Sequence, residues 1–229
     1  MGYSEVYQSW QNDPEGYWMQ LAEAIDWDQK PSKALFEAGE NLYEWFADGR
    51  LNGCWNAVDR HVAGGRGDQV AIIHDSPITD SQQKITFAEL QTRVATLAGA
   101  LRAKGVEQGD RVIIYMPMVP EALEAMLACA RLGAVHSVVF GGFAAHELAV
   151  RIDDAKPRAI LAASCGIEPG RIVAYKPLVD GAIEQAAHKP EFTVIFQRDP
   201  ETADLVEGRD FDWDEIQRDV IPADCVPVE

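Results

Sequence analysis

The fold of this chain is decided by residues 109–143, which read GDRVIIYMPMVPEALEAMLACARLGAVHSVVFGGF. Residues 112–115 form a continuous apolar run, and Pro120 then opens a helical pattern of apolar residues. A second apolar run, residues 135–140, follows and ends at Gly141-Gly142. Strands that are apolar on both faces and alternate with helices are typical of a parallel sheet covered on both sides.

The same alternation extends beyond this stretch in both directions. Thr86-Phe87-Ala88-Glu89 is a capping box that predicts a helix start. This helix ends at Gly105. The other predicted elements are strands at 70–73, near 85, at 159–163 and at 193–196, and helices at 144–153, at 178–187 and near 213–218. We therefore expect an α/β fold, a mostly parallel doubly wound sheet with helices on both faces and right-handed crossovers.

Residues 1–67 are predicted to form a helical, aromatic-rich N-terminal extension. Asp13-Pro14-Glu15 combines an N-cap carboxylate with Pro at the first helical position. The apolar stripe that follows needs a surface to cover, and Trp45, Phe46 and Trp55 are expected to be core packing. Residues 68–229 are then the first part of a larger sheet-containing domain.

The charge of the chain restricts its partners. The chain has 37 Asp and Glu against 20 Lys and Arg, a formal net charge of −17, so a nucleic acid or an anionic membrane would be repelled. The sequence has no transmembrane-length apolar run and no signal-peptide pattern, so we expect a cytoplasmic protein. Cys54, Cys129, Cys165 and Cys225 form no CxxC pair, which favours reduced thiols and no metal site.

Three loops are candidates for ligand binding, because open parallel sheets bind ligands outside the carboxyl ends of their strands. They are residues 117–120, 141–143 and 164–171. In the second, paired glycines let backbone N–H groups approach a phosphate at a helix start, and a simple tight turn is the alternative. In the third, Arg171 is either a bidentate phosphate clamp or a solvated arginine.

Catalytic residues do not stand out. His136 lies within an apolar strand and is expected to be a satisfied core histidine. Cys129 is expected to be inert packing, and Cys165 has no histidine nearby in sequence to activate it. No acid pair, triad or metal-ligand spacing is present, so no catalytic residue is predicted.

At this point the residues resemble a known family. Residues 109–118 and 128–143 are similar to the short-chain acyl-CoA synthetases, AMP-forming adenylating ligases that include acetyl-CoA and propionyl-CoA synthetase. Residues 166–171 with 175–178 resemble the propionyl-CoA synthetase branch. Further residues resemble the N-terminal extension of that family: Tyr7, Pro14, Trp18, Ile25, Asp26, Trp27, Leu51, Asn52, Asn56, Asp59, Arg60 and His61.

The resemblance implies a two-step ligase. A short-chain carboxylate, propionate or acetate, reacts with ATP and magnesium to give acyl-AMP, and the thiol of CoA then displaces AMP. Gly142 matches the family's glycine at the CoA nucleotide, and the segment Glu168, Pro169, Gly170, Arg171 matches its contact with the 3′-phosphate. Acetyl-CoA synthetases commonly have arginine where this chain has Glu168. Recognition of the 3′-phosphate would then depend on Arg171, with Lys176 as a second cation.

The family's phosphate loop, acyl pocket and catalytic lysine have no counterpart in these residues. We therefore interpret the chain as the front portion of such an enzyme, inactive alone and holding no cofactor tightly. Its partners would be the carboxylate, ATP, CoA and the remainder of its own polypeptide. The alternatives are a free-standing binding or interaction module with the same sheet, or a different doubly wound nucleotide-binding enzyme. A reading frame that continues past Glu229 would favour the first interpretation.

Overall fold

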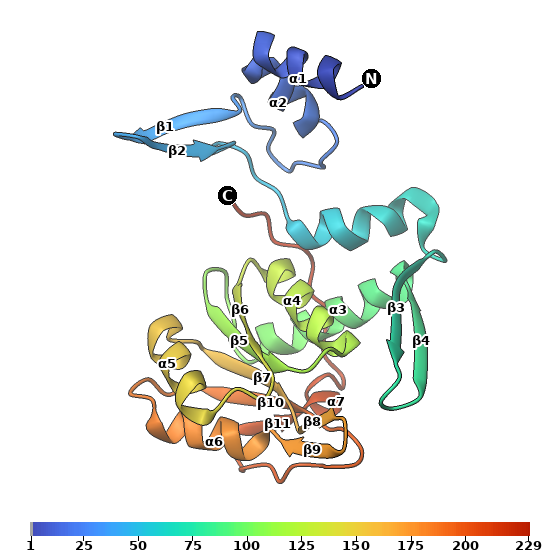
Figure 1. The fold of residues 1–229 in the computed structure, drawn as a ribbon, viewed down its shortest axis with the longest axis vertical. Helices are drawn as coiled ribbons and strands as arrows, with labels where there is room; N and C mark the ends of the chain where they lie inside the picture. The colour runs from blue at the N-terminus through green and yellow to red at the C-terminus, as the bar shows by residue number, and fades with distance from the viewer. Residues whose placement is uncertain (1) are drawn as a thin grey trace.

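A computed structural model describes residues 2–229. Within them the body of the molecule is a five-stranded sheet in the order β11-β10-β7-β5-β6 (Figure 1). Every neighbouring pair in this sheet is parallel. The strands are β5 (Arg111–Met116), β6 (Val135–Phe140), β7 (Ala159–Ala163), β10 (Phe192–Phe196) and β11 (Asp210–Asp212).

The order of the strands determines which face each helix covers. The connection from β5 to β6 moves toward one edge, whereas those from β6 to β7 and from β7 to β10 move toward the other. Right-handed crossovers therefore place α4 (Pro120–Leu132) on one face, and α5 (Ala145–Ala155) and α6 (Lys176–Gln185) on the opposite face. α3 (Phe87–Ala103) packs beside α4, and α5 packs beside α6. The predicted doubly wound α/β fold is confirmed.

Burial differs strongly between the centre and the edge of the sheet. All five residues of β7 are buried, and so are Val112 to Met116 of β5. The edge strand β6 is different, because Val135, Val138 and Phe140 are exposed. His136 is exposed on this same strand, so the prediction of a core histidine is wrong. Its strand is apolar enough for the centre of a sheet but lies at an edge.

The predicted helix ends are present. The Thr86 side chain accepts a hydrogen bond from the Glu89 amide, and the Glu89 carboxylate accepts one from the Thr86 amide. Asp13 caps α2 (Pro14–Ala22) by accepting a hydrogen bond from the Gly16 amide over 3.0 Å. The hairpin predicted around residues 70–85 is β3 (Val70–Ser76) with β4 (Ser81–Thr86).

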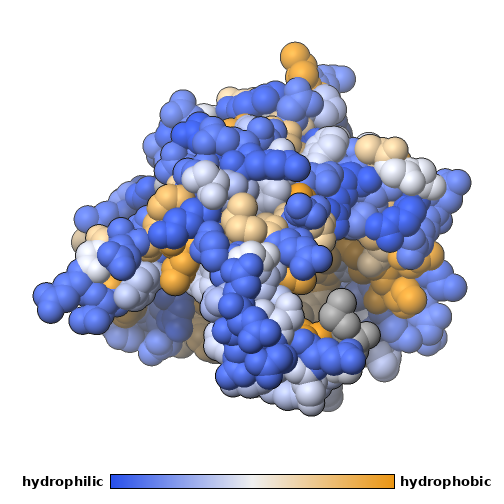
Figure 2. All heavy atoms as spheres, turned by 90° about the horizontal axis from the view of Figure 1, so that it is seen from above, coloured by the Kyte–Doolittle hydropathy of each residue, from blue (hydrophilic) through white to orange (hydrophobic). Residues whose placement is uncertain are grey.

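The N-terminal extension is less helical than expected. After α1 (Tyr3–Asn12) and α2, residues form a hairpin of β1 (Leu35–Gly39) and β2 (Leu42–Trp45). Two π-helical segments follow, η1 (Trp55–Asp59) and η2 (Val62–Arg66). In Figure 1 the first part of the extension stands apart from the sheet. Seen from that side, the surface is mostly hydrophilic, with hydrophobic side chains gathered in separate patches (Figure 2).

A third hairpin corrects the sequence prediction near the candidate ligand loops. Residues 164–171 were expected to be a long loop, but they contain β8 (Cys165–Glu168), which pairs antiparallel with β9 (Arg171–Ala174). Downstream, α7 (Trp213–Ile216) confirms the short helix predicted in the acidic tail. In the described part of the chain, no helix combines the length and apolar character needed to cross a membrane.

Candidate functional site

The topology alone selects one ligand-binding edge. The direction of strand addition reverses beside β5, between β6 on one side and β7 on the other. Open parallel sheets leave a crevice at such a point, outside the carboxyl ends of the strands. A cavity of about 300 Å³ lies at this edge. It is lined by His74, Asp75, Ser76, Pro77, Ile78, Thr79, Pro117, Met118, Phe140, Gly141, Ile167, Glu168, Tyr175 and Arg198.

The Gly141-Gly142-Phe143 junction is fastened to the end of β5 by one tyrosine. The buried Tyr115 hydroxyl accepts a hydrogen bond from the Gly142 amide over 3.0 Å and donates one to the Phe143 carbonyl over 2.7 Å. Burial raises the pKa of Tyr115 to about 12, so the hydroxyl keeps the proton it donates. Gly142 has φ of +97°, a conformation that favours glycine.

This contact changes the role expected for Gly142. Its N–H was predicted to be a donor that could approach a phosphate, but Tyr115 already uses it. The contribution left to Gly142 is the absence of a side chain, which keeps the surface beside the hairpin open. The carboxylate of Glu168 lies 4.0 Å from the position that a Cβ of residue 142 would take. The structure thus brings Gly142 and Glu168 close together.

A second tyrosine joins the glycine junction to the β8–β9 hairpin. The ring of Tyr175 lies 5.1 Å from that of Tyr115, measured between centroids. It is so close to Gly141 that a Cβ there would lie 2.6 Å from the ring. Burial also raises the pKa of Tyr175. The Tyr175 ring thus lies against both Gly141 of the junction and Gly166 of β8.

The predicted anion clamp is paired with an acid of its own hairpin. Arg171 donates from Nε to Glu168 Oε2 over 2.6 Å, and its Nη2 lies at the same distance. The Arg171 side chain is 69% exposed, and the hydrogen bond to Glu168 raises its pKa. Pro169 and Gly170 form the exposed turn between them. An incoming phosphate would therefore compete with a carboxylate for this guanidinium.

Lys176 does not supply the second cation that the sequence suggested. Its ammonium is buried, and it lies 2.6 Å from a carboxylate oxygen of Asp180 and 2.9 Å from one of Asp210. The lysine belongs to the internal ion network that fastens α6 to β11. Sequence proximity to Arg171 suggested a shared site, but the helix start turns this side chain into the core.

Arg198 is the lining cation that the sequence analysis missed. It follows β10 and donates from Nη1 to the Cys165 carbonyl over 2.9 Å, beside the cavity. The strand-end rule could have found it, because β10 ends at the same edge as β5 and β7. His74 was also missed, because it lies in the predicted hairpin and not in a loop at the end of a parallel strand.

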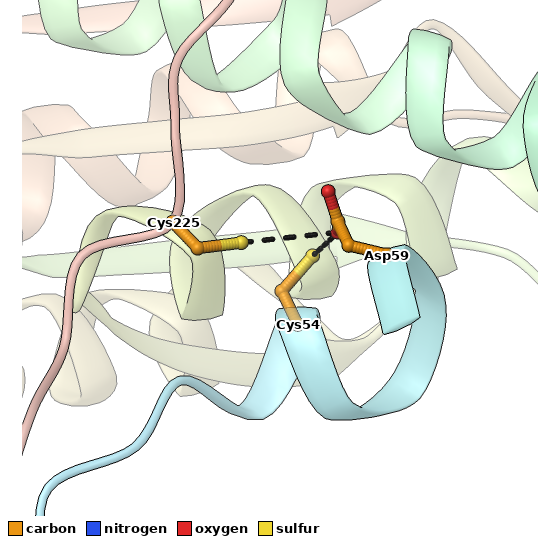
Figure 3. A group of neighbouring side chains, drawn as sticks. All are labelled: Cys54, Asp59 and Cys225. Carbon is orange, nitrogen blue, oxygen red and sulfur yellow. Dashed lines mark hydrogen bonds between the residues drawn. The ribbon is translucent and has the colours of Figure 1, made fainter. Parts of the chain in front are cut away.

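A different cluster lies where η1 and the end of the described chain pack beside the last turn of α4. Cys54, Asp59 and Cys225 place their sulfur and oxygen atoms within 4.8 Å of one another (Figure 3). Arg131, in the last turn of α4, lies 2.7 Å from the Asp59 carboxylate. Thiols and carboxylates are metal-ligand types, but no spacing in the sequence pointed to this group. The expectation of no metal stays a prediction.

Fold and crevice together define a doubly wound α/β domain with its ligand edge at the topological switch point. The sequence pattern of the family described as "AMP-binding enzyme" matches residues 59–226, and that described as "Acetyl-coenzyme A synthetase N-terminus" matches residues 3–57. The chain belongs to the AMP-binding enzyme family, and its N-terminal residues are those of the acetyl-CoA synthetase type.

Individual relatives agree with this assignment. An uncharacterized protein of Pseudomonas aeruginosa is 53% identical over 94% of the chain and 34% of its own length. The human mitochondrial acyl-CoA synthetase short-chain family member 3 is 48% identical over 94% of the chain and 32% of its own length. The propionate–CoA ligase of Escherichia coli is 43% identical over 100% of the chain and 36% of its own length.

A solved structure shows the same fold. The acetoacetyl-CoA synthetase from Streptomyces lividans superposes with a TM-score of 0.87 at 23% identity, over 100% of this chain and 34% of that one. The chain therefore spans about one third of the length of the curated relatives that it matches.

Proposed function

We propose that this chain is the N-terminal part of an AMP-forming acyl-CoA synthetase for short-chain carboxylates. In that reaction a carboxylate attacks the α-phosphorus of ATP, pyrophosphate leaves, and the thiol of CoA displaces AMP from the acyl-AMP. The observation that carries the proposal is the crevice at the switch point, where Gly142 and the Glu168–Arg171 hairpin meet over the two tyrosines. The family membership supports the chemistry, and ATP, magnesium and CoA are its substrates.

The hairpin and the glycine junction are proposed to form one edge of the CoA site. Gly142 leaves room for the nucleotide of CoA, and Arg171 on the exposed hairpin would leave Glu168 to turn toward its 3′-phosphate. Glu168 lies next to both, and its negative charge opposes the phosphate. This arrangement predicts weaker phosphate recognition than a hairpin with two cations would give.

The acyl group is proposed to be propionate. The propionate–CoA ligase of Escherichia coli aligns with the whole chain, and residues 166–178 resemble that branch. The test is kcat/KM of the full-length gene product for propionate, acetate and acetoacetate with ATP and CoA. A preference for acetate or acetoacetate would overturn the propionate assignment, and no thioester from any of them would overturn the proposed function. The 229-residue chain alone is expected to show no carboxylate-dependent pyrophosphate exchange.

The CoA edge has a direct test in Arg171→Ala. The substitution is expected to raise the KM for CoA about tenfold, the size of one charge-assisted hydrogen bond. Acyl-AMP formation should stay unchanged, because this step precedes CoA. The parent should discriminate against dephospho-CoA, which lacks the 3′-phosphate, and the variant should hardly do so.

The matched control is Arg218→Ala. Arg218 is 70% exposed and pairs with Glu215 at the same i,i+3 spacing, but it follows α7 and does not line the cavity at the switch point. It should leave both KM values at the parent level. If Arg171→Ala keeps the parent's preference for CoA over dephospho-CoA, Arg171 is a solvated hairpin residue.

Two further assignments are proposals. We place the boundary between the N-terminal extension and the sheet-containing domain at residues 67 and 68, just after η2, which limited proteolysis of the chain would test. We also propose a cytoplasmic location, which differs from the mitochondrial one in the name of the human relative. Cell fractionation with an antibody to the chain distinguishes the two.

A further inference from the structure

Two cysteines that are remote in sequence face each other where the N-terminal extension meets the end of the described chain. Cys54 lies at the start of η1, and Cys225 lies in the extended tail that runs past α4 (Figure 3). Both are free thiols in the described chain. Their Sγ atoms lie 3.9 and 3.8 Å from the same Asp59 oxygen, and the three groups fit within 4.8 Å.

Hydrogen bonds hold the two backbones in this position. Leu51 and Val228 exchange a pair of backbone hydrogen bonds of 3.0 and 2.8 Å. The Asn52 side chain donates to the Val226 carbonyl over 2.7 Å, and the Val226 amide donates to the Arg131 carbonyl. These hydrogen bonds between residues 51–52 and the tail hold the two cysteines next to each other. Closing the gap to an S–S bond of about 2.05 Å requires side-chain rotation and a small shift of the tail.

The charges around the pair act in opposite directions, since Arg131 stabilises a Cys54 thiolate and the Asp59 carboxylate opposes one. The hydrogen bond from the Cys225 thiol lowers the pKa of Cys54; burial opposes this, and the Arg131 guanidinium, 3.7 Å from Cys54 Sγ, lowers it further. The same hydrogen bond and burial raise the pKa of Cys225. Proton transfer between the two sulfurs can place the thiolate on either one. Cys129, by contrast, has a pKa raised to about 12 by burial alone.

A small oxidant can reach one sulfur of the pair. A cavity of about 490 Å³ opens beside it and is lined by Cys225, Asp59 and Arg131 among others. Cys225 is partly exposed on its wall, while Cys54 is fully buried behind it. The pair therefore combines an accessible sulfur with a sheltered one whose pKa is lowered.

A metal ion fits this cluster poorly. Arg131 already supplies the positive charge, with Nη1 2.7 Å from Asp59 Oδ2 and Nε bonded to the Ala223 carbonyl. A divalent cation on the same carboxylate and thiolates would be held against this buried guanidinium. The arginine that disfavours a metal is the group that favours a reactive thiolate.

We infer that Cys54 and Cys225 form a reversible disulfide when the protein meets a peroxide. The Cys225 thiol passes its proton to the Cys54 thiolate as its sulfur attacks one oxygen of hydrogen peroxide; the O–O bond breaks, a sulfenic acid and hydroxide result, and the hydroxide takes the proton back from Cys54. The Cys54 thiolate attacks the sulfenic sulfur, the S–O bond breaks, and a second hydroxide leaves as the S–S bond forms. Both hydroxides take up the protons of the thiols, so two thiols and one peroxide give a disulfide and two waters.

The bond would clamp the tail to the extension. In the reduced protein this contact depends on hydrogen bonds, so the tail can separate from residues 51–54 without breaking a covalent bond. In the oxidised protein the covalent bond keeps the two segments together. A cross-link between such distant residues also restricts the unfolded chain, which stabilises the folded state. We expect the oxidised form to melt several degrees higher than the reduced form.

The test is peptide mapping of the full chain after treatment with hydrogen peroxide. The expected product is a peptide pair joined through Cys54 and Cys225, with Cys129 and Cys165 alkylated as free thiols after unfolding. Dithiothreitol should return all four thiols. The inference is overturned if Cys225 stops at sulfenic acid, if it pairs with another cysteine, or if peroxide leaves both thiols free.

A matched pair of variants separates the cross-link from general effects of cysteine loss. Cys54→Ser should abolish the peroxide-dependent rise in melting temperature, whereas Cys129→Ser, at an equally buried thiol, should keep it. If Cys54→Ser does not fold, mapping of the parent chain still decides the question. Zinc alone is the last probe, and tight one-to-one binding that blocks alkylation of both thiols would make the cluster a metal site and overturn the inference.

Discussion

Strands β7 and β2 show how differently the body and the N-terminal extension are stabilised. Every residue of β7 is buried at the centre of the sheet, and every residue of β2 is exposed. The extension relies on contacts between aromatic rings, such as Trp18 with Trp45 at 5.1 Å and Trp27 with Phe46 at 5.6 Å. Trp45 is 53% exposed and Trp55 37%, so the prediction that these two tryptophans are core packing is wrong. Apolar content predicts an element, but not the surface that it covers.

The largest loss of stability should follow when a central side chain of the body is truncated. Leu161 of β7 is fully buried between α-helical layers. Leu161→Ala is expected to lower the free energy of unfolding by about 2–5 kcal/mol, because it removes buried methyl groups and leaves a cavity. Urea unfolding followed by circular dichroism measures it. A loss below about 1 kcal/mol would mean that the sheet centre is not the stable part of the molecule.

Next in size is the buried ion network that fastens the last strand to the body. Asp210 is fully buried at its side chain and accepts hydrogen bonds from Thr193 and Arg209, both 2.6 Å long. Burial raises the pKa of Asp210, but these bonds and the nearby Lys176 lower it more, so the net pKa lies well below the ordinary 3.8. Asp210→Asn is expected to cost about 1–3 kcal/mol at pH 7.

The stabilisation that Asp210 contributes depends on pH in a definite direction. Because the folded pKa of Asp210 is below the unfolded one, its stabilisation is fully present above about pH 4 and is lost as the pH falls further. The difference between the parent and Asp210→Asn should therefore shrink between pH 4 and pH 2. Asp28→Asn, on an exposed side chain of the extension, should show no comparable difference. A constant difference across this range would exclude Asp210 as the titrating group.

The elements that sequence predicts best are those whose signals are local. The run from β5 through α4 to β6 follows from apolar runs, Pro120 at a helix start, and Gly133 in the left-handed conformation at its end. Strand β11 escaped prediction because its three residues, Asp210 to Asp212, include two acids and pair only through tertiary contact. The β8–β9 hairpin escaped because each strand has four residues.

The candidate site was predictable only in part for the same reason. Strand ends selected the loops at 141–143 and 164–171, since parallel strands bring their carboxyl ends to one edge, and the family resemblance then pointed to Gly142 and Glu168 within them. No local pattern shows that Tyr115 takes the Gly142 amide or that Lys176 turns inward to Asp210. Those are facts of packing between segments far apart in sequence.

A smaller effect is expected from the tyrosine that fastens the glycine junction. Tyr115→Phe keeps the ring but leaves the Gly142 amide and the Phe143 carbonyl without their partner. In the full-length gene product, the KM for CoA should rise several-fold, the size of a hydrogen bond worth about 1 kcal/mol, while acyl-AMP formation is unchanged. Tyr43→Phe is the control, because Tyr43 lies exposed on the extension. Equal loss in both half-reactions would indicate general destabilisation instead of positioning.

The smallest effect should come from the extension itself. Leu42 opens β2 and is 59% exposed, so little surface is removed from water when this hairpin forms. Leu42→Ala is expected to change the free energy of unfolding by less than about 0.5 kcal/mol, the usual range for surface positions. This is much smaller than the loss expected for Leu161→Ala. Urea unfolding at two protein concentrations tenfold apart makes the comparison decisive. A cost above about 1 kcal/mol that grows with concentration would mean that the hairpin is buried against a second copy of the chain, and the extension would then be stabilised by burial as the body is.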